Sequence, residues 1–186
     1  DTVTTVVGWT DPVFPGDGSG DPSEKTPDGA DGALVKLNHP TDLLEAPDGA
    51  VLVMAWHNHK LRRIDPETGR VTIIAGGGAG FAGDGGPMAK ALFKQPKSLT
   101  ADDSGNLYIG DYSANVIRKV TSSGTVSVHA GTAPTPGTSD GTTTAALFYG
   151  PSGVAIDSST NLYVADTLNH TVRKISSTGP YTRAAR

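Results

Sequence analysis

Two neighbouring stretches decide the fold: Asn161-Leu162-Tyr163-Val164-Ala165-Asp166 and Asn169-His170-Thr171-Val172-Arg173-Lys174-Ile175. Both occur earlier in the chain, as Asn106-Leu107-Tyr108-Ile109-Gly110-Asp111 and Ile117-Arg118-Lys119-Val120. A more diverged copy comes first, as Val51-Leu52-Val53-Met54-Ala55 and Leu61-Arg62-Arg63-Ile64. The copies are separated by 56 and then 55 residues, measured between Pro40, Pro96 and Pro151. A period of this size indicates a supersecondary unit that buries its apolar face by stacking on copies of itself.

Each copy divides into four short, strand-like segments that are separated by turn residues. In the second copy these segments span residues 97–102, 106–109, 116–120 and 125–129. The alternation in the third segment predicts that Arg62, Arg118 and Arg173 face the solvent. Four short antiparallel strands per repeat are typical of one propeller blade. The sequence therefore predicts an all-β fold, a β-propeller of four-stranded antiparallel blades, with three blades in this chain as part of a larger ring or assembly.

The composition supports short strands joined by many turns, and it excludes several kinds of site. Of 186 residues, 36% are apolar and 18% are charged, and the chain has 24 Gly and 13 Pro. The absence of Cys excludes a disulfide framework and a thiolate metal site. A net charge of −4 argues against nucleic acid as a partner, because phosphate binding needs a basic surface. We expect no membrane span, since no apolar run approaches the roughly 20 residues that a spanning helix needs.

The repeat resembles the NHL repeat, a β-propeller motif. The resemblance is carried by the two stretches quoted first, and by an inter-blade linker, Gly83-Asp84-Gly85-Gly86-Pro87 followed by Ala91-Leu92-Phe93. It covers residues 28–177 and predicts blades at about 28–76, 77–131 and 132–177. The resemblance implies a propeller, for which six blades are usual in this family, and it says almost nothing about activity.

The two ends of the chain are expected to serve assembly. Residues 1–27 contain a predicted outer strand and then a Gly/Pro/Asp-rich insertion, whereas residues 178–186 form a tail that is a poor strand. The third blade would then lack its own outer strand, and an open edge exposes unpaired backbone groups. We therefore expect the N-terminal strand to complete the third blade of another copy, in a two-chain ring or a filament, or of a missing part of a longer chain. This strand consists of Val3, Thr4, Thr5, Val6 and Val7.

The leading function predicted from the sequence is a non-catalytic binding or assembly module. The tips between second and third strands fall on the same propeller face as the inter-blade linkers, and this face is expected to contact a protein or glycan. Its candidate binding residues are Trp56, His57, Tyr112 and Leu168. The low charge and the Thr/Ser/Gly/Pro content indicate a secreted or cell-surface protein. The alternative is a hydrolase or lyase that uses a divalent metal near the propeller axis, as the amidating lyases of this fold do.

Candidate metal and modification sites are favoured less than structural roles for the same residues. His57 and His59 lie two residues apart and are a candidate zinc pair, although a loop or packing role is favoured. The acidic residues between positions 17 and 28 are spaced as in a calcium-binding loop, with candidate ligands Asp17, Ser19, Asp21 and Asp28. Pro22 stands where such loops need Gly, so an insertion without a metal is favoured. No cofactor is expected. Asn169 begins a formal N-glycosylation sequon. Asp84 is expected to shape its linker turn, and Asp111 and Asp166 to accept turn hydrogen bonds.

Overall fold

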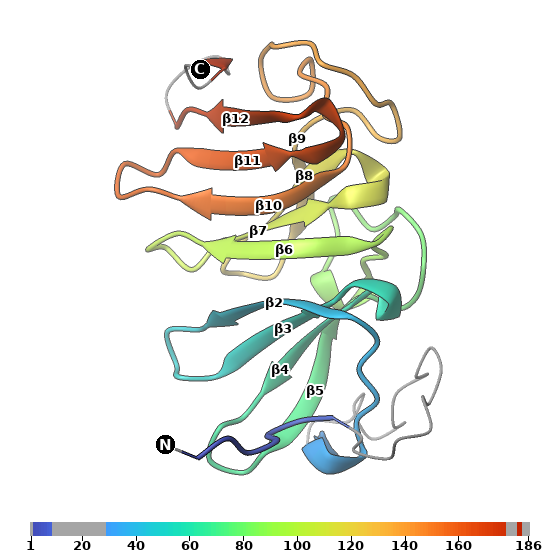
Figure 1. The fold of residues 1–186 in the computed structure, drawn as a ribbon, viewed down its shortest axis with the longest axis vertical. Coiled ribbons are helices and arrows are strands. Elements are labelled where there is room, and N and C mark those ends of the chain that lie inside the picture. Colours follow the sequence, from blue (N-terminus) through green and yellow to red (C-terminus); the bar gives the residue numbers. More distant parts are fainter. Residues whose placement is uncertain (1, 9–28, 178–181, 184–186) are drawn as a thin grey trace.

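The computed structural model describes residues 2–8, 29–177 and 182–183, and it folds into three antiparallel sheets that stack as blades (Figure 1). Blade one has the strand order β1-β5-β4-β3-β2, blade two β6-β7-β8-β9 and blade three β10-β11-β12-β13. The strands of blade one are β1 (Ala30–Asp31), β2 (Pro40–Glu45), β3 (Val51–Ala55), β4 (Lys60–Ile64) and β5 (Arg70–Ala75). Those of blade two are β6 (Pro96–Ala101), β7 (Leu107–Asp111), β8 (Val116–Val120) and β9 (Val126–Ala130). Those of blade three are β10 (Pro151–Ile156), β11 (Leu162–Asp166), β12 (Thr171–Ile175) and β13 (Thr182–Arg183).

The all-β propeller architecture predicted from the repeat is confirmed. The first strands of the blades, β2, β6 and β10, lie side by side, with β6 between the other two (Figure 1). Single 3-10 turns complete the connections: η2 (Gly32–Leu34), η3 (Trp56–Asn58), η4 (Met88–Lys90), η5 (Tyr112–Ala114) and η6 (Thr167–Asn169). Within the described ranges, none of the helical segments is long and apolar enough to cross a membrane.

Side chains of the repeat fix its turns. Asp102 accepts hydrogen bonds from the backbone N–H groups of Ser104 at 3.0 Å and Asn106 at 2.9 Å, which closes the turn between β6 and β7. Asp157 does the same after β10. Such side-chain acceptors replace backbone partners in tight turns. The recurring Asp and Asn at these positions therefore encode the turn of the blade.

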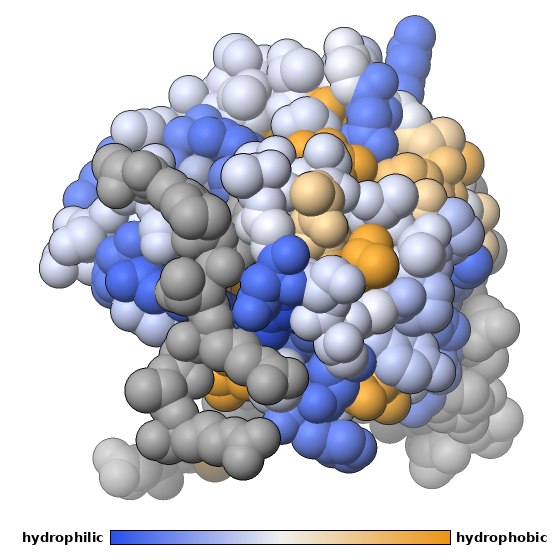
Figure 2. All heavy atoms as spheres, turned by 90° about the horizontal axis from the view of Figure 1, so that it is seen from above, coloured by the Kyte–Doolittle hydropathy of each residue, from blue (hydrophilic) through white to orange (hydrophobic). Residues whose placement is uncertain are grey.

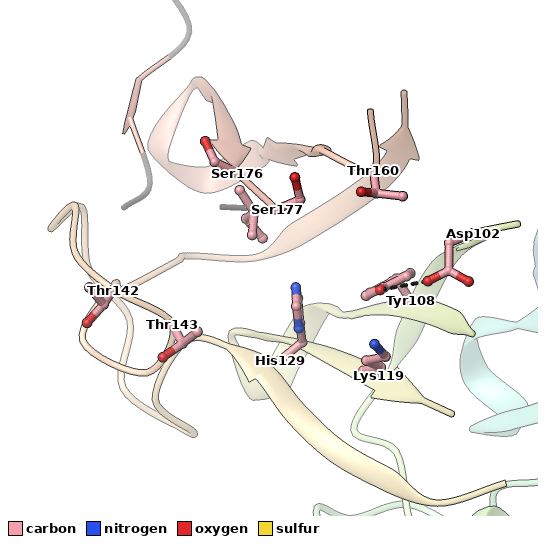
Figure 3. A pocket seen from close by; sticks show the side chains of 10 residues that line it. Asp102, Tyr108, Lys119, His129, Thr142, Thr143, Thr160, Ser176 and Ser177 are labelled. Atoms are coloured by element: carbon pink, nitrogen blue, oxygen red, sulfur yellow. Dashed lines mark hydrogen bonds between the residues drawn. The ribbon is translucent and has the colours of Figure 1, made fainter. Parts of the chain in front are cut away.

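The blades adhere through apolar residues at two junctions. The first junction, between blades one and two, buries hydrophobic residues of both sheets and of the linker, namely Leu52, Met54, Leu61, Phe93, Leu99 and Ile109. The second junction, between blades two and three, buries Tyr108, Ile117, Phe148, Leu162 and Val164. Fully burying one large apolar side chain stabilises a fold by about 1.5–3 kcal/mol. The second junction also contains a pocket with polar walls, which Figure 3 shows.

The predicted exposure of the recurring arginines was wrong. Arg62 and Arg118 are 0% exposed and Arg173 is 2% exposed. Each guanidinium contacts a carbonyl of the segment that precedes its blade, from Lys36, Leu92 and Leu147 respectively. A buried guanidinium needs several acceptors, and the inter-blade linkers supply them.

The ends of the chain also differ from expectation. In blade three the position of the outer strand is occupied by β13, whose residues Thr182 and Arg183 pair with Lys174 and Arg173. The segment 3–7 forms no ladder with any described strand of this chain, and lies beside blade one instead. There the Gly8 N–H donates to the Gly32 carbonyl at 3.1 Å. Pairing of residues 3–7 with another copy stays a prediction.

Candidate binding face

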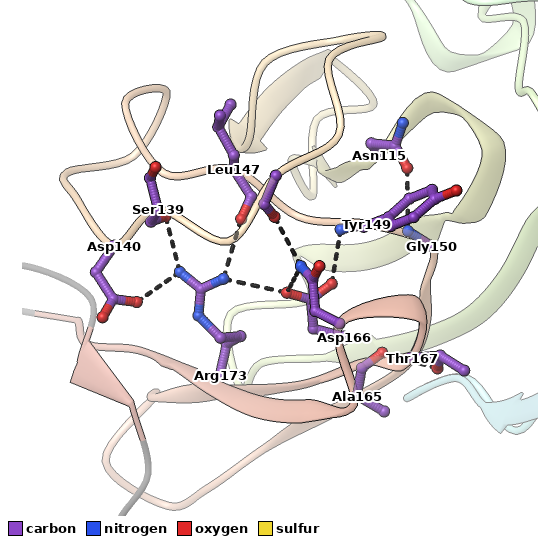
Figure 4. A network of polar contacts seen from close by, with 12 residues as sticks. Asn115, Ser139, Asp140, Leu147, Tyr149, Gly150, Ala165, Asp166, Thr167 and Arg173 are labelled. Atoms are coloured by element: carbon purple, nitrogen blue, oxygen red, sulfur yellow. Dashed lines mark hydrogen bonds and ion pairs between the residues drawn. The ribbon is translucent and has the colours of Figure 1, made fainter.

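A buried arginine braces blade three against its own incoming linker (Figure 4). Arg173 Nη1 donates to the Leu147 carbonyl at 3.0 Å and to Asp166 Oδ2 at 3.1 Å. Its Nη2 donates to the Ser139 carbonyl at 3.0 Å and to Asp140 Oδ1 at 2.6 Å. The charged pair with Asp166 is almost fully buried, so the four acceptors together offset the desolvation of the guanidinium.

Blade two repeats this brace with one difference. Arg118 donates to the Leu92 carbonyl at 2.7 Å and to the carboxylate of Asp84 at 2.9 Å. The carboxylate of Asp111, which corresponds to Asp166, instead accepts the backbone N–H of Lys94 at 2.9 Å. Burial raises the pKa of the Asp111 carboxyl to about 7. The predicted role of Asp111 was therefore wrong in detail, because its carboxylate accepts from the linker and makes no cap hydrogen bond to its own turn. Asp84, which was expected to shape its linker turn, also pairs with the brace.

Blade one lacks the aspartate and replaces it with a neighbouring amide. Ala55 stands where Asp111 and Asp166 stand, at the end of the second strand. Asn58 Oδ1 accepts the Asn38 N–H at 2.8 Å and Arg62 Nη1 at 3.0 Å. The equivalent donors in blade three, the Tyr149 N–H and Arg173 Nη1, bind Asp166. The departure of blade one from the repeat is therefore accounted for by a structural substitution.

Three of the predicted binding residues meet around one lysine. Lys97 Nζ lies 4.0 Å from the centroid of the Trp56 ring and 3.8 Å from that of Tyr112. The rings of Trp56 and His57 are 4.2 Å apart, and His39 lies 4.5 Å from His57. We call these five residues the Lys97 cluster. Partial burial lowers the pKa of Lys97, while contact with two aromatic faces favours its ammonium form.

Leu168 belongs to the same face, on the far side of Tyr112. A Cβ atom built on Gly150 would lie 2.8 Å from the Tyr112 ring and 2.9 Å from Leu168 Cδ1, so both side chains flank this glycine. Lys97 and His39 were not among the residues predicted from the sequence. Their signal is their position: each adjoins a landmark proline at the start of a first strand, on the face where the 3-10 tips lie.

His59 links two blades. Its Nδ1 accepts the backbone N–H of Gln95 at 3.1 Å, just before β6. The equivalent residue of blade two, Asn115, accepts the N–H of Gly150 through Oδ1 at 3.0 Å. His170 occupies this position in blade three. One ring nitrogen of His59 is thus used in packing, and a zinc role for His57 and His59 stays a prediction.

The remaining candidates have other surroundings. Among residues 2–8, 29–177 and 182–183, no three His, Asp or Glu side chains form a group suited to hold a metal ion. The calcium candidates Asp17, Ser19, Asp21 and Asp28 lie outside the described residues. Asn169 Nδ2 donates to the Gly137 carbonyl at 2.7 Å and to Asp166 at 2.8 Å. A glycan on this nitrogen would disturb both hydrogen bonds.

Comparison with known proteins supports the repeat and the fold. Residues 148–175 match the model of the NHL repeat. The protein SUPPRESSOR OF QUENCHING 1, chloroplastic, of Arabidopsis thaliana is 37% identical over 90 residues, which are 48% of this chain and 8% of that protein.

Solved structures share the architecture over most of this chain. An auxiliary nutrient binding protein from Bacteroides ovatus is 25% identical with a TM-score of 0.62, over 74% of this chain and 36% of that one. A virginiamycin B lyase from Staphylococcus aureus is 17% identical with a TM-score of 0.55, over 79% of this chain and 41% of that one, and shares the fold. The chain thus spans well under half the length of these relatives. Residues 148–175 thus match the NHL repeat, and the chain has a β-propeller fold of three stacked antiparallel blades.

Proposed function

We propose that this chain is a non-catalytic binding module whose protein or glycan ligand contacts the Lys97 cluster. The observation that carries the proposal is the position of Lys97 Nζ between the Trp56 and Tyr112 rings, at 4.0 Å and 3.8 Å from their centroids. Trp and Tyr are enriched where binding energy concentrates at interfaces, and their faces attract a nearby ammonium group. The likeness to a nutrient binding protein supports a binding role.

The test is a glycan array and a displayed peptide library, both probed with the intact chain. We expect a defined set of glycans or peptides to bind, and the Trp56→Ala and Lys97→Ala variants to lose that binding. Tyr163→Ala is the matched control, because Tyr163 is an aromatic residue of β11 outside the cluster. Equal binding by the unaltered chain and both cluster variants would contradict the proposal. Stoichiometric zinc or calcium in the purified protein, with hydrolase or lyase activity, would favour the enzymatic alternative.

A second function, self-association, is favoured by the outer side of blade three. Val172 is 52% exposed, whereas its equivalents Leu61 and Ile117 are fully buried at the two junctions. On blade one, Leu43 is 64% exposed, whereas its equivalent Leu99 is 4% exposed. Figure 2 views the molecule from the blade-three end and shows apolar side chains among polar ones there. We propose that blade one of a second copy docks on this side.

The internal junctions specify the contact. His59 and Asn115 each accept an N–H from the residue before the next landmark proline, so His170 would accept the N–H of His39 in the second copy. Light scattering should give a mass above the 19.0 kDa of one chain. Val172→Asp should disperse the assembly, and Ser122→Asp, an equal charge on an exposed turn of blade two, should not. A monomer at every concentration contradicts the proposal.

Location outside the cell or on its surface is also proposed, from the low charge and the Thr/Ser/Gly/Pro content alone. Fractionation of the source cells tests it. Recovery of the intact protein from the cytosol only would contradict it.

A further inference from the structure

The second junction contains a pocket of about 450 Å³ that no apolar side chain fills. This volume lies within the range of small-molecule sites, about 300–1,000 Å³. Figure 3 shows His129 projecting into the middle of the space, with Tyr108 and Asp102 on one side and Thr142 and Thr143 on the other. The lining residues are Asp102, Tyr108, Lys119, His129, Thr142, Thr143, Thr160, Ile175, Ser176 and Ser177.

The same place in the first junction is occupied by hydrocarbon. His129 in β9 corresponds to Ile74 in β5, and both residues lie at the bulge opposite the third strand. Thr143 corresponds to Met88, three residues before the Ala of the linker motif. Ile74 and Met88 both pack against the core of the first junction. These two replacements of apolar by polar residues accompany the opening of the pocket, while the third and fourth strands of the two blades pair in the same register.

The polar groups of the pocket are unequally satisfied. The Asp102 carboxylate already accepts the Tyr108 hydroxyl at 3.0 Å, as well as its three turn hydrogen bonds. Lys119 Nζ lies 5.3 Å from the Tyr108 ring centroid, and no carboxylate pairs with it among the described residues. The pocket thus presents one ammonium group whose charge is not neutralised by a salt bridge, while the adjacent carboxylate has its lone pairs occupied.

His129 is a neutral hydrogen-bonding group here. Burial and the charge of Lys119 lower the pKa of its imidazole to about 4, and its ring lies 5.0 Å from that of Tyr108. A neutral imidazole can donate through one nitrogen and accept through the other. Together with five Ser and Thr hydroxyls around it, it suits a ligand that carries several hydroxyl groups.

We propose that this pocket binds a small polyhydroxylated carboxylic acid of the uronic acid class. The carboxylate pairs with Lys119, the sugar hydroxyls bond to His129 and to the surrounding Ser and Thr, and the C–H groups contact Tyr108 and Ile175. The site lies in the second junction and shares no residue with the Lys97 cluster. Failure of one proposal therefore leaves the other standing.

The test is a titration of the intact chain with D-glucuronate, followed by NMR of the His129 ring and by calorimetry. We expect saturable shifts of His129, with D-glucose and acetate binding at least about tenfold more weakly, since each supplies only part of the interactions. Inorganic phosphate controls for a simple anion site. Phosphate binding as tight as that of glucuronate, or no shift of His129 at millimolar glucuronate, would overturn the proposal.

Three variants locate the site. Lys119→Ala and His129→Ile should each weaken glucuronate binding by at least about tenfold, and His129→Ile restores the residue type of the first junction. Lys174→Ala is the matched control, because Lys174 occupies the same position in β12 above Tyr163, outside the pocket. Unfolding midpoints near that of the unaltered chain show that the variants fold. Wild-type affinity in Lys119→Ala and His129→Ile would contradict the proposal.

Discussion

The two junctions between blades are built from strands that pair in the same register, and their interiors differ. At the first, Ile74 and Met88 pack against a continuous apolar core. At the second, His129 and Thr143 stand in their places and a pocket opens. Both junctions keep the arginine brace and the hydrogen bond to the residue before the landmark proline. The blade is thus defined by a small polar framework, and the positions between these fixed points are free to acquire a binding site.

The two arginine braces should differ in their contribution to stability. Arg173→Ala leaves the fully buried Asp166 without its counter-charge. Removing one partner of a buried pair costs about 3–5 kcal/mol, so urea unfolding should show a loss of that size. Arg118→Ala should cost less, because its carboxylate partner Asp84 is partly exposed. An equal or greater loss for Arg118→Ala would show that the two braces do not differ in this way.

A pH dependence should distinguish blade two. The pKa of Asp111 is raised to about 7 in the folded chain, from 3.8, so the folded state binds this proton more tightly than the unfolded state. Stability from this group is therefore present in acid and is lost as pH rises from about 4 to about 7, by about 2–4 kcal/mol in total. Asp111→Asn should flatten that slope in unfolding experiments at several pH values. Parallel slopes for both proteins would refute the assignment.

Two substitutions should convert the polar contacts of blade one to the pattern of blade two. Asn58→Ala removes the acceptor of the Arg62 guanidinium and of the Asn38 N–H. Leaving such buried donors unpaired costs about 1–3 kcal/mol. Adding Ala55→Asp recreates the Asp111 and Ala114 arrangement and should recover part of the loss. The measurement is the free energy of unfolding of the single and double variants, and no recovery would count against the equivalence.

A double substitution should make the interior of the second junction resemble that of the first. The double substitution His129→Ile and Thr143→Met places the first junction's side chains in the pocket. Burial of a few methylene groups, each worth about 0.8 kcal/mol, should raise the free energy of unfolding by about 1–2 kcal/mol. A thermal scan of the double variant beside the unaltered chain checks this. A clear decrease in the unfolding midpoint would show that the second junction cannot accommodate the side chains of the first.

The sequence predicted the repeat, the strands and the blade stacking, because these depend on turn residues and on apolar alternation. The prediction of solvent exposure was wrong for Arg62, Arg118 and Arg173, because an Arg-Lys or Arg-Arg pair in a short strand is typical of a solvent-exposed face. The missing information was long-range: the linker carbonyls that satisfy each guanidinium lie about 26 residues upstream. A signal did exist, because Asp84 and Asp140 precede Arg118 and Arg173 at nearly constant separations of 34 and 33 residues.

The candidate sites were predictable to different extents. Trp56, His57 and Tyr112 were found because propeller topology places the 3-10 tips on one face. Lys97 was missed, since the sequence does not show that its side chain reaches the tips of two blades. The pocket around His129 was also missed. Its signal was a histidine with no counterpart in the other copies, at a position where blade one has Ile74.

The arginine brace also sets an order of events during synthesis. All four acceptors of Arg173, from Ser139, Asp140, Leu147 and Asp166, precede it in the chain. As the polypeptide emerges from the ribosome at about 5–20 residues per second, the linker and the first two strands of a blade are present before their cation. Until Arg173 has been added, these acceptors have no guanidinium to bind. The brace can therefore form once the third strand is present, before the outer strand β13 is added.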